Sequence, residues 1–252
     1  MASAPDAGNF DIGRAFGTAF RAVFANFLIY LGLGAVFLGV PIVVFATSLT
    51  GFVAQSMSGN DPLTVGLLGT VALGGILLLV GTVMLQAALV RATVEYLNDR
   101  TPNFGDCIQV GLRAFLPLIG IGLIVGLGVA FGLLLLIIPG IILWVMWSVA
   151  VPVHVEERAG VFDSLNRSRA LTKGSRWAIF GLIVAMTIVN WVMQVALQTI
   201  GGIGGEISGA TLGMVGSLIG SLFTSALTAA IYVELRTTKE GANVSELAAI
   251  FN

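Results

Sequence analysis

The stretch that decides the fold is residues 114–155, AFLPLIGIGLIVGLGVAFGLLLLIIPGIILWVMWSVAVPVHV, which contains no Lys, Arg, Asp or Glu. As one α-helix it would be about 60 Å long, about twice the thickness of the hydrocarbon core of a bilayer. The stretch must therefore fold back on itself. Pro139-Gly140 is the best position for the turn, because Pro and Gly together interrupt a helix. A turn nearer Gly132, with Pro139 as a kink, is the alternative.

Four other uncharged runs are each long enough for one membrane-spanning helix of about 20 apolar residues. The chain of 252 residues is 57% hydrophobic and only 10% charged, whereas soluble domains have about 25% charged residues. The sequence therefore predicts an all-α membrane protein of one domain, residues 1–252, with about six transmembrane helices that form three hairpins. The four single helices are expected at roughly Phe27–Thr50, Leu63–Val90, Trp177–Ile200 and Ala210–Val233.

The distribution of charge predicts the orientation of these helices. All twelve Lys and Arg residues fall on one side of the six-helix topology, which is also the side of both termini, and the opposite side has only Asp61 and Glu206 as charged residues. Basic residues concentrate in cytoplasmic loops, and an odd number of spans would spoil this partition. We therefore expect both termini in the cytoplasm and a multi-pass location in a bacterial inner (plasma) membrane.

A short pattern occurs three times along the chain and predicts an internal repeat. Each copy has a Phe, an acidic residue that could cap a helix N-terminus, a short helix carrying Arg, and then an apolar run. The inferred unit is a short interfacial amphipathic helix followed by a helical hairpin. The copies begin with Phe10 and Asp11, Phe104 and Asp106, and Phe162 and Asp163, and the predicted repeats are residues 10–99, 100–158 and 159–240.

The first of these short helices has an aromatic stripe. Phe16, Phe20, Phe24 and Phe27 follow one another at steps of three and four residues, so they share one face of a helix. A helix that lies in the interface would place this face among acyl chains. The alternative is that the segment only lengthens the first span.

Residues 163–177, DSLNRSRALTKGSRW, concentrate positive charge beside a predicted span. Such a cluster is typical of a site for anionic lipid head groups or another phosphate-bearing ligand. The alternative is that these residues only determine topology and pair with Glu156 and Glu157. The candidate lipid- or phosphate-binding residues are Arg167, Arg169, Lys173 and Arg176.

Several motifs in this half of the chain resemble a known family, the membrane domain attached to some bacterial glycerophosphoryl diester phosphodiesterases, together with its stand-alone inner-membrane relatives. The resemblance covers most of residues 100–252 and, more loosely, the first hairpin. It implies a fold and a location but no reaction, because the soluble phosphodiesterase domain and an acidic metal cluster are both missing from this sequence. The motifs are Pro139-Gly140, Trp144, Trp147, Val151-Pro152, Glu156, the run from Arg167 to Gly174, and Tyr232-Val233-Glu234-Leu235-Arg236.

Polar residues line one face of each of the last two predicted spans. Amides in hydrocarbon are costly unless they are paired, so these faces require an explanation. They could line a polar path for a solute, or they could hydrogen-bond to each other and lock the helices together. The candidates are Asn190, Gln194 and Gln198 on the fifth span, and Ser217, Ser221 and Thr228 on the sixth, where Thr224 and Ser225 lie largely along the same side.

Glycine pairs spaced four residues apart predict close helix contacts, because small residues at this spacing let two helices approach. The spacing does not distinguish contacts within the chain from contacts with a second copy or another membrane protein. The pairs are Gly122 and Gly126, Gly128 and Gly132, Gly209 and Gly213, and Gly216 and Gly220.

Residues able to carry catalysis are scarce. Cys107 is the only cysteine and His154 the only histidine, which excludes an intrachain disulfide and any two-histidine metal motif. We therefore expect no catalytic residue, metal or cofactor, and no nucleic-acid partner. The predicted function is that of a non-enzymatic inner-membrane module with a structural, lipid-binding or partner-binding role. The alternative is a small-solute or lipid transporter or channel that uses the polar faces of spans five and six.

Overall fold

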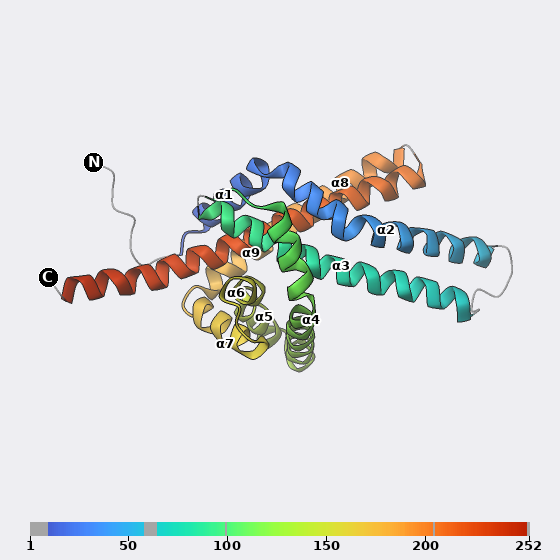
Figure 1. Ribbon diagram of the computed structural model, residues 1–252. Coiled ribbons are helices and arrows are strands. Elements are labelled where there is room, and N and C mark those ends of the chain that lie inside the picture. The colour runs from blue at the N-terminus through green and yellow to red at the C-terminus, as the bar shows by residue number, and fades with distance from the viewer. Residues whose placement is uncertain (1–9, 58–64, 99, 204, 251–252) are drawn as a thin grey trace.

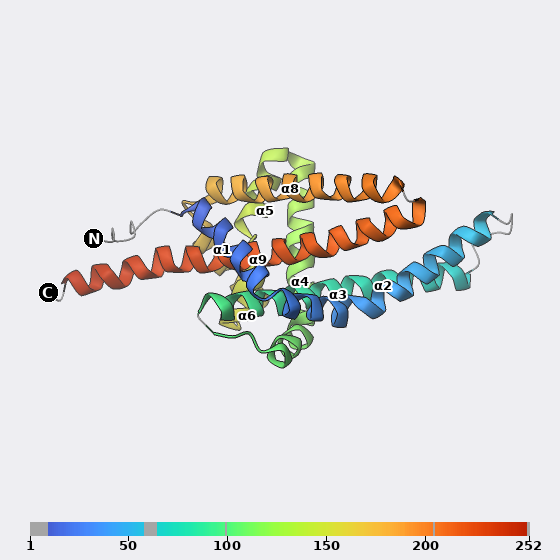
Figure 2. The same ribbon diagram turned by 90° about the horizontal axis from the view of Figure 1, so that it is seen from above.

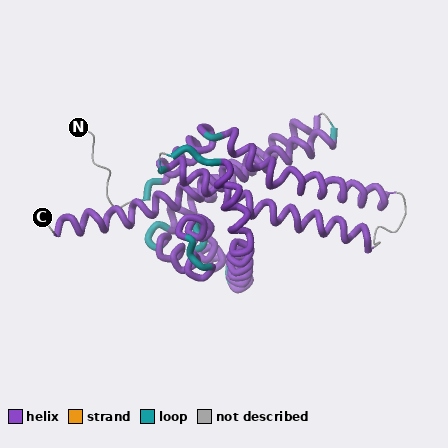
Figure 3. The backbone as a smooth tube through the Cα atoms, viewed as in Figure 1, coloured by secondary structure: helices purple, strands orange, loops and turns teal. Residues whose placement is uncertain are grey.

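The computed structural model describes residues 10–57, 65–98, 100–203 and 205–250, and all regular secondary structure within these ranges is helical (Figures 1 and 3). Side chains are not described at 56, 65–67, 206–211, 214 and 242–250. The helices are α1 (Ile12–Ala25), α2 (Phe27–Met57), α3 (Val65–Leu97), α4 (Phe104–Leu135), α5 (Ile137–Met146), α6 (Ala150–Glu157), α7 (Val161–Thr172), α8 (Arg176–Ile203) and α9 (Glu206–Ile250).

Six helical segments are long and apolar enough to cross a bilayer. They are α2, α3, α4, the combined α5–α6 segment, α8 and most of α9. Many large apolar side chains along these segments are exposed, and contact with lipid makes such a surface stable. The chain therefore has the features of a multi-pass membrane protein, in agreement with the class predicted from its sequence.

The apolar helices pack in consecutive pairs, and the pairs do not share one direction. Helix α2 lies against α3, α4 against α5, and α8 against α9, while α3 also packs on α9 and joins two of the pairs. Figure 2 shows α2, α3, α8 and α9 running in one common direction, with α4 and α5 running across it. The α4–α5 pair therefore differs in direction from the α2–α3 and α8–α9 pairs.

The core lies where α1, α3 and α9 meet near the ends of the α2–α3 and α8–α9 pairs. Tyr30 of α2 and Thr93 of α3 are both fully buried, and their hydroxyl oxygens are 2.5 Å apart. Ala88 and Ala226 are fully buried in the same cluster. Small residues at these positions allow α3 and α9 to approach closely.

Helix boundaries agree only in part with the predicted caps. Asp11 is the N-cap of α1 and accepts a hydrogen bond from a first-turn amide at 3.0 Å, as predicted. The predicted caps at Asp106 and Asp163 are wrong, because the N-caps of α4 and α7 are Asn103 and Gly160. Both carboxylates lie in the first turn instead, where the helix dipole also favours a negative charge.

The second predicted surface helix is not a separate element. Helix α4 continues without interruption from Phe104 to Leu135 through Pro117. The turn that follows lies at Leu136, between the two positions that the sequence left open. Pro139 is the third residue of α5, where proline is tolerated because the missing N–H has no intrahelical acceptor.

The aromatic stripe of α1 faces protein as well as the surface. The ring of Phe20 lies between its neighbours Phe16 and Phe24 and is 4.6 Å, centroid to centroid, from Phe223 of α9. Phe24 remains largely exposed, while the alanines at 15, 19 and 22 are buried against the core. Helix α1 is therefore attached to α9 along its small-residue face, with the aromatic face at the edge of that contact.

Candidate functional site

Ion pairs tie the short helices to the ends of the apolar helices. Arg91 of α3 pairs with Glu95 at 2.9 Å, with Asp106 of α4 at 3.0 Å and with Glu156 of α6 at 3.3 Å. Arg14 of α1 pairs with Glu234 of α9 at 2.6 Å. Charged residues are thus gathered at one end of the molecule, and part of that charge is neutralised within the protein.

Arg167 of α7 belongs to this network rather than to a free basic surface. Its guanidinium pairs with Glu157 of α6 at 3.1 Å and also with Glu240 of α9. Tyr232 donates a hydrogen bond to the same Glu157 carboxylate at 3.1 Å. Burial lowers the pKa of Arg167, but the bonds to Glu240 and Glu157 outweigh burial and leave this pKa above its ordinary value.

The other three predicted basic residues surround a depression of about 380 Å³ at the junction of α7 and α8. Arg169, Lys173 and Arg176 line it, and within the described part of the chain none of the three pairs with a carboxylate. The Nε atom of Arg176 is buried and has no hydrogen-bond partner. We call this site the basic depression.

A fourth cation and an aromatic ring complete the surroundings of the basic depression. Lys239 of α9 donates hydrogen bonds to the carbonyls of Ala170 and Lys173, both at 2.7 Å. Trp177, the residue after Arg176, is 85% exposed. Tryptophan favours the boundary between water and lipid, and unpaired Arg and Lys groups bind phosphate oxygens. The arrangement is therefore suited to a phosphate group at a membrane surface.

The amides predicted on the fifth span face α9. Asn190 donates to the hydroxyl of Thr224 at 3.4 Å, and Gln194 donates to the hydroxyl of Ser217 at 2.6 Å. The side chain of Gln198 lies over Gly213. We call this α8–α9 contact the amide seam, and its hydrogen bonds are those expected of residues that lock two helices together.

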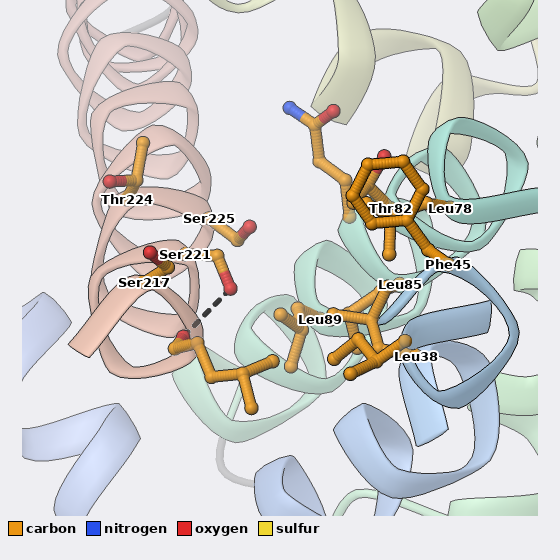
Figure 4. Close-up of a pocket in the computed structure, with 13 residues that line it drawn as sticks. Leu38, Phe45, Leu78, Thr82, Leu85, Leu89, Ser217, Ser221, Thr224 and Ser225 are labelled. Atoms are coloured by element: carbon orange, nitrogen blue, oxygen red, sulfur yellow. Dashed lines mark hydrogen bonds between the residues drawn. The ribbon is translucent and has the colours of Figure 1, made fainter. Parts of the chain in front are cut away.

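A cavity of about 500 Å³ lies beside the amide seam, between α9 and the α2–α3 pair, and Ser217 and Thr224 belong to both. Figure 4 shows Ser217, Ser221, Thr224 and Ser225 of α9 on one wall, opposite leucines of α2 and α3. The leucines and the other described lining residues are Leu38, Ile42, Phe45, Leu78, Thr82, Leu85, Gln86, Leu89 and Leu218, and none of these described residues is charged.

Sequence reasoning placed Ser225 on the polar face of the sixth span but missed a second polar group of this cavity, Gln86. Gln86 of α3 lines it, and Ser225 of α9 is 5% exposed; within the described chain neither side chain makes a hydrogen bond. An amide inside the predicted span 63–90 was a readable signal for Gln86. Thr228, which was predicted on this face, does not line the cavity and instead donates to the carbonyl of Thr224.

The described residues contain no group of three or more His, Cys, Asp or Glu side chains that could hold a metal ion. His154 lies 2.7 Å, through Nδ1, from the carbonyl oxygen of Ala159, so its ring has a local structural contact. Cys107 is fully buried. The titratable groups most suited to chemistry are therefore dispersed in the part of the chain that the structure describes.

Comparisons with protein-family models, with curated proteins and with solved structures find no match for this chain. The resemblance to the phosphodiesterase-associated membrane domain therefore stays a prediction. Any functional conclusion depends on the basic depression, the amide seam and the cavity themselves.

Proposed function

We propose that this protein is a non-enzymatic module of a bacterial inner membrane that binds an anionic lipid through the basic depression. The α2–α3 and α8–α9 pairs cross the membrane as hairpins, and both termini are cytoplasmic. Support for this orientation comes from the twelve basic residues, which all fall on the side of the termini. The basic depression then lies at the cytoplasmic surface, which carries the anionic lipids.

The observation that carries the proposal is the contrast between paired and unpaired cations at one end of the molecule. Arg91 and Arg167 each contact two or more carboxylates, whereas Arg169, Lys173 and Arg176 contact none in the described chain. A set of cations held around one depression without a counter-ion repels itself. An anionic head group relieves this repulsion, and the buried Nε of Arg176 gains an acceptor.

Exposed aromatic residues support a lipid as the source of this anion. Trp177 follows the depression directly, and Phe162 of α7 is 72% exposed. Both rings are too apolar to be favoured in water and suit the acyl side of an interface. A lipid would place its phosphate among the cations and its chains beside these rings, whereas a soluble phosphate would leave the rings in water.

The test is lipid binding by a triple variant, Arg169→Gln, Lys173→Gln and Arg176→Gln. Each basic group near an anionic surface contributes about 1 kcal/mol at moderate salt, so three correspond to roughly a 100-fold loss of affinity for phosphatidylglycerol. Native mass spectrometry of protein in mixed micelles measures this affinity. Unchanged phosphatidylglycerol retention in the triple variant refutes the proposal and leaves these residues with a role in topology.

A matched control variant distinguishes lipid binding at the basic depression from attraction by the net positive charge of this surface. Arg21, Arg100 and Arg113 are exposed, belong to the same side of the predicted topology and have no ion pair in the described chain. Their triple Gln variant removes the same charge without touching the basic depression. We expect it to keep most of the affinity, and an equal loss in both variants would mean that net charge alone binds the lipid.

A second function, binding or passage of an uncharged amphiphile, is favoured by the cavity. Ser225 and Gln86 are polar groups at membrane depth that make no side-chain hydrogen bond to the part of the chain that the structure describes. Such groups are costly unless something supplies a hydrogen bond. Ser225→Leu should fill part of the cavity and displace a copurified neutral lipid seen in the native protein by mass spectrometry. Phosphatidylglycerol binding at the basic depression should be unchanged. Absence of any neutral lipid from the native protein would count against this second function.

A further inference from the structure

The turn between α4 and α5 consists only of large aliphatic residues. We call residues 133–138, Leu-Leu-Leu-Leu-Ile-Ile, the apex. Its residues from Leu134 to Ile138 are 68% to 82% exposed. No Ser, Thr, Asn, Gln, Tyr, His or charged residue occurs anywhere in residues 115–147. A turn with this composition is unstable in water.

The connections of the other two pairs are different in chemistry. The segment between α2 and α3 begins Ser58-Gly59-Asn60-Asp61, and the one between α8 and α9 contains Gly205, directly before Glu206 at the start of α9. Gly, Asn, Asp and Ser are the residues that form turns in contact with water. The α2–α3 and α8–α9 connections are therefore suited to an aqueous surface, and the apex is suited to hydrocarbon.

The base of α5 is fixed at the level of α7. Ser168 and Thr172 of α7 donate hydrogen bonds to the carbonyl of Met146, the last residue of α5, at 2.8 Å and 3.3 Å. Helix α7 also carries Arg167 and Arg169, so it lies at the water interface. From that level α5 has 10 residues, so its far end can lie at most about 15 Å deeper, which is half of the hydrocarbon core, and less where the helix is inclined.

The turn itself limits the backbone groups that hydrocarbon would leave unpaired. Leu136 alone separates the two helices, and its N–H donates to the carbonyl of Gly132 at 3.0 Å. Pro139 has no N–H to satisfy. Gly132 and Gly140 let the two arms touch, since a Cβ on Gly132 would lie 2.8 Å from the Cα of Gly140. Hydrocarbon tolerates few open polar groups. Because Leu136 is the only residue outside a helix here, the turn adds little to the helix-end groups that any two helices leave open.

We propose that α4 and α5 form a re-entrant hairpin whose apex lies among lipid acyl chains of the cytoplasmic leaflet and does not reach the opposite aqueous phase. The direction of the pair agrees, because α4 and α5 run across the four helices of the other pairs (Figure 2). This replaces the sequence-based expectation that both arms cross the membrane. A hairpin that returns to its starting side leaves both termini on one side, so the orientation proposed above is unaffected.

The test is the accessibility of a single cysteine at the apex, Leu136→Cys, with Cys107→Ala as background. A charged, membrane-impermeant maleimide is applied to intact cells and to inside-out vesicles. Ile203→Cys, at the 86% exposed end of α8, is the control for the outer face, and Asn166→Cys on α7 for the inner face. We expect each control cysteine to be labelled from its own side only. We expect Leu136→Cys to be labelled from neither side.

A second measurement locates the apex directly. A nitroxide attached at residue 136 should be more accessible to oxygen than to a water-soluble nickel chelate, and the order should be reversed at residue 203. Ile138→Cys provides an independent apex position, and an unchanged thermal unfolding midpoint shows that each variant is folded. Labelling of residue 136 from the outer face would mean that the arms cross, and labelling from the inner face would place the apex in water; both results overturn the proposal.

Discussion

The α8–α9 pair and the α4–α5 pair both depend on glycine, but they use it for opposite purposes. In the amide seam, glycines of α9 make room for polar side chains of α8, which then hydrogen-bond to neighbouring hydroxyls. In α4–α5, Gly132 and Gly140 bring backbone against backbone, and Gly128 receives the ring of Trp147. The same glycine-rich composition therefore produces one pair locked by hydrogen bonds and one held by close packing alone.

The largest expected effect comes from the backbone contact of α4 with α5. A Cβ on Gly132 would lie within 2.9 Å of the Gly140 nitrogen, and a Cβ on Gly140 would lie 2.7 Å from the nitrogen of Leu133. Backbone cannot rotate away as a side chain does, so Gly132→Ala and Gly140→Ala should each cost about 1–3 kcal/mol. Thermal unfolding in detergent measures the loss.

Glycines on the same helix provide the control for this prediction. Gly122 and Gly126 have no atom within 4 Å of an added Cβ. Gly122→Ala and Gly126→Ala should leave stability unchanged or raise it slightly, because alanine is the better helix former. A loss at these two positions equal to that at Gly132 would mean that the α4–α5 contact is not what distinguishes them.

A smaller effect is expected at the amide seam. A Cβ on Gly216 would lie 2.6 Å from Oε1 of Gln194, and one on Gly220 would lie 2.6 Å from Oδ1 of Asn190. Because side-chain atoms can move, Gly216→Ala and Gly220→Ala should each cost about 1 kcal/mol, less than Gly132→Ala. A larger loss of stability for Gly216→Ala than for Gly132→Ala would contradict this comparison between the two pairs.

The smallest effect is expected from the amides themselves. Asn190→Leu and Gln194→Met keep the approximate shape of each side chain and remove one interhelical hydrogen bond. Such bonds contribute about 0.6 kcal/mol on average in membranes, with a maximum near 1.7. The unfolding midpoint should therefore fall only slightly, and a loss well above this range would show that the seam contributes more than its two hydrogen bonds.

Local sequence patterns predict the helices better than their ends. Uncharged runs correctly predict α2, α3, α8 and the apolar part of α9, because hydrocarbon excludes charged residues wherever they occur. The turn at Leu136 escapes prediction because Pro139 has two compatible roles, as a helix breaker and as a first-turn residue. The aliphatic composition of residues 133–138 was a local signal for a turn in lipid. The level of α5 beside α7 was not predictable locally, because it depends on how the helices pack.

The site is predicted less completely, for a related reason. The sequence identifies four basic residues near α7, but the partner that removes Arg167 from this set, Glu240, is 73 residues away. Gln86 and Ser225 line the same cavity although their helices, α3 and α9, are far apart in the sequence. Pairing across such separations is decided by how the helices pack, which spacing along one helix does not reveal.

Helix α9 has a mechanical consequence. Its 45 residues form one unbroken element, about 68 Å long and more than twice the thickness of the hydrocarbon core. A helix of this length can transmit motion as a lever that pivots at its contacts with α3. Any tilt at the end beside α8 displaces the far arm, where Glu240 engages Arg167 and Arg236. Lys239, the residue before Glu240, donates to the carbonyls of Ala170 and Lys173, so such a displacement would act directly on residues that line the basic depression.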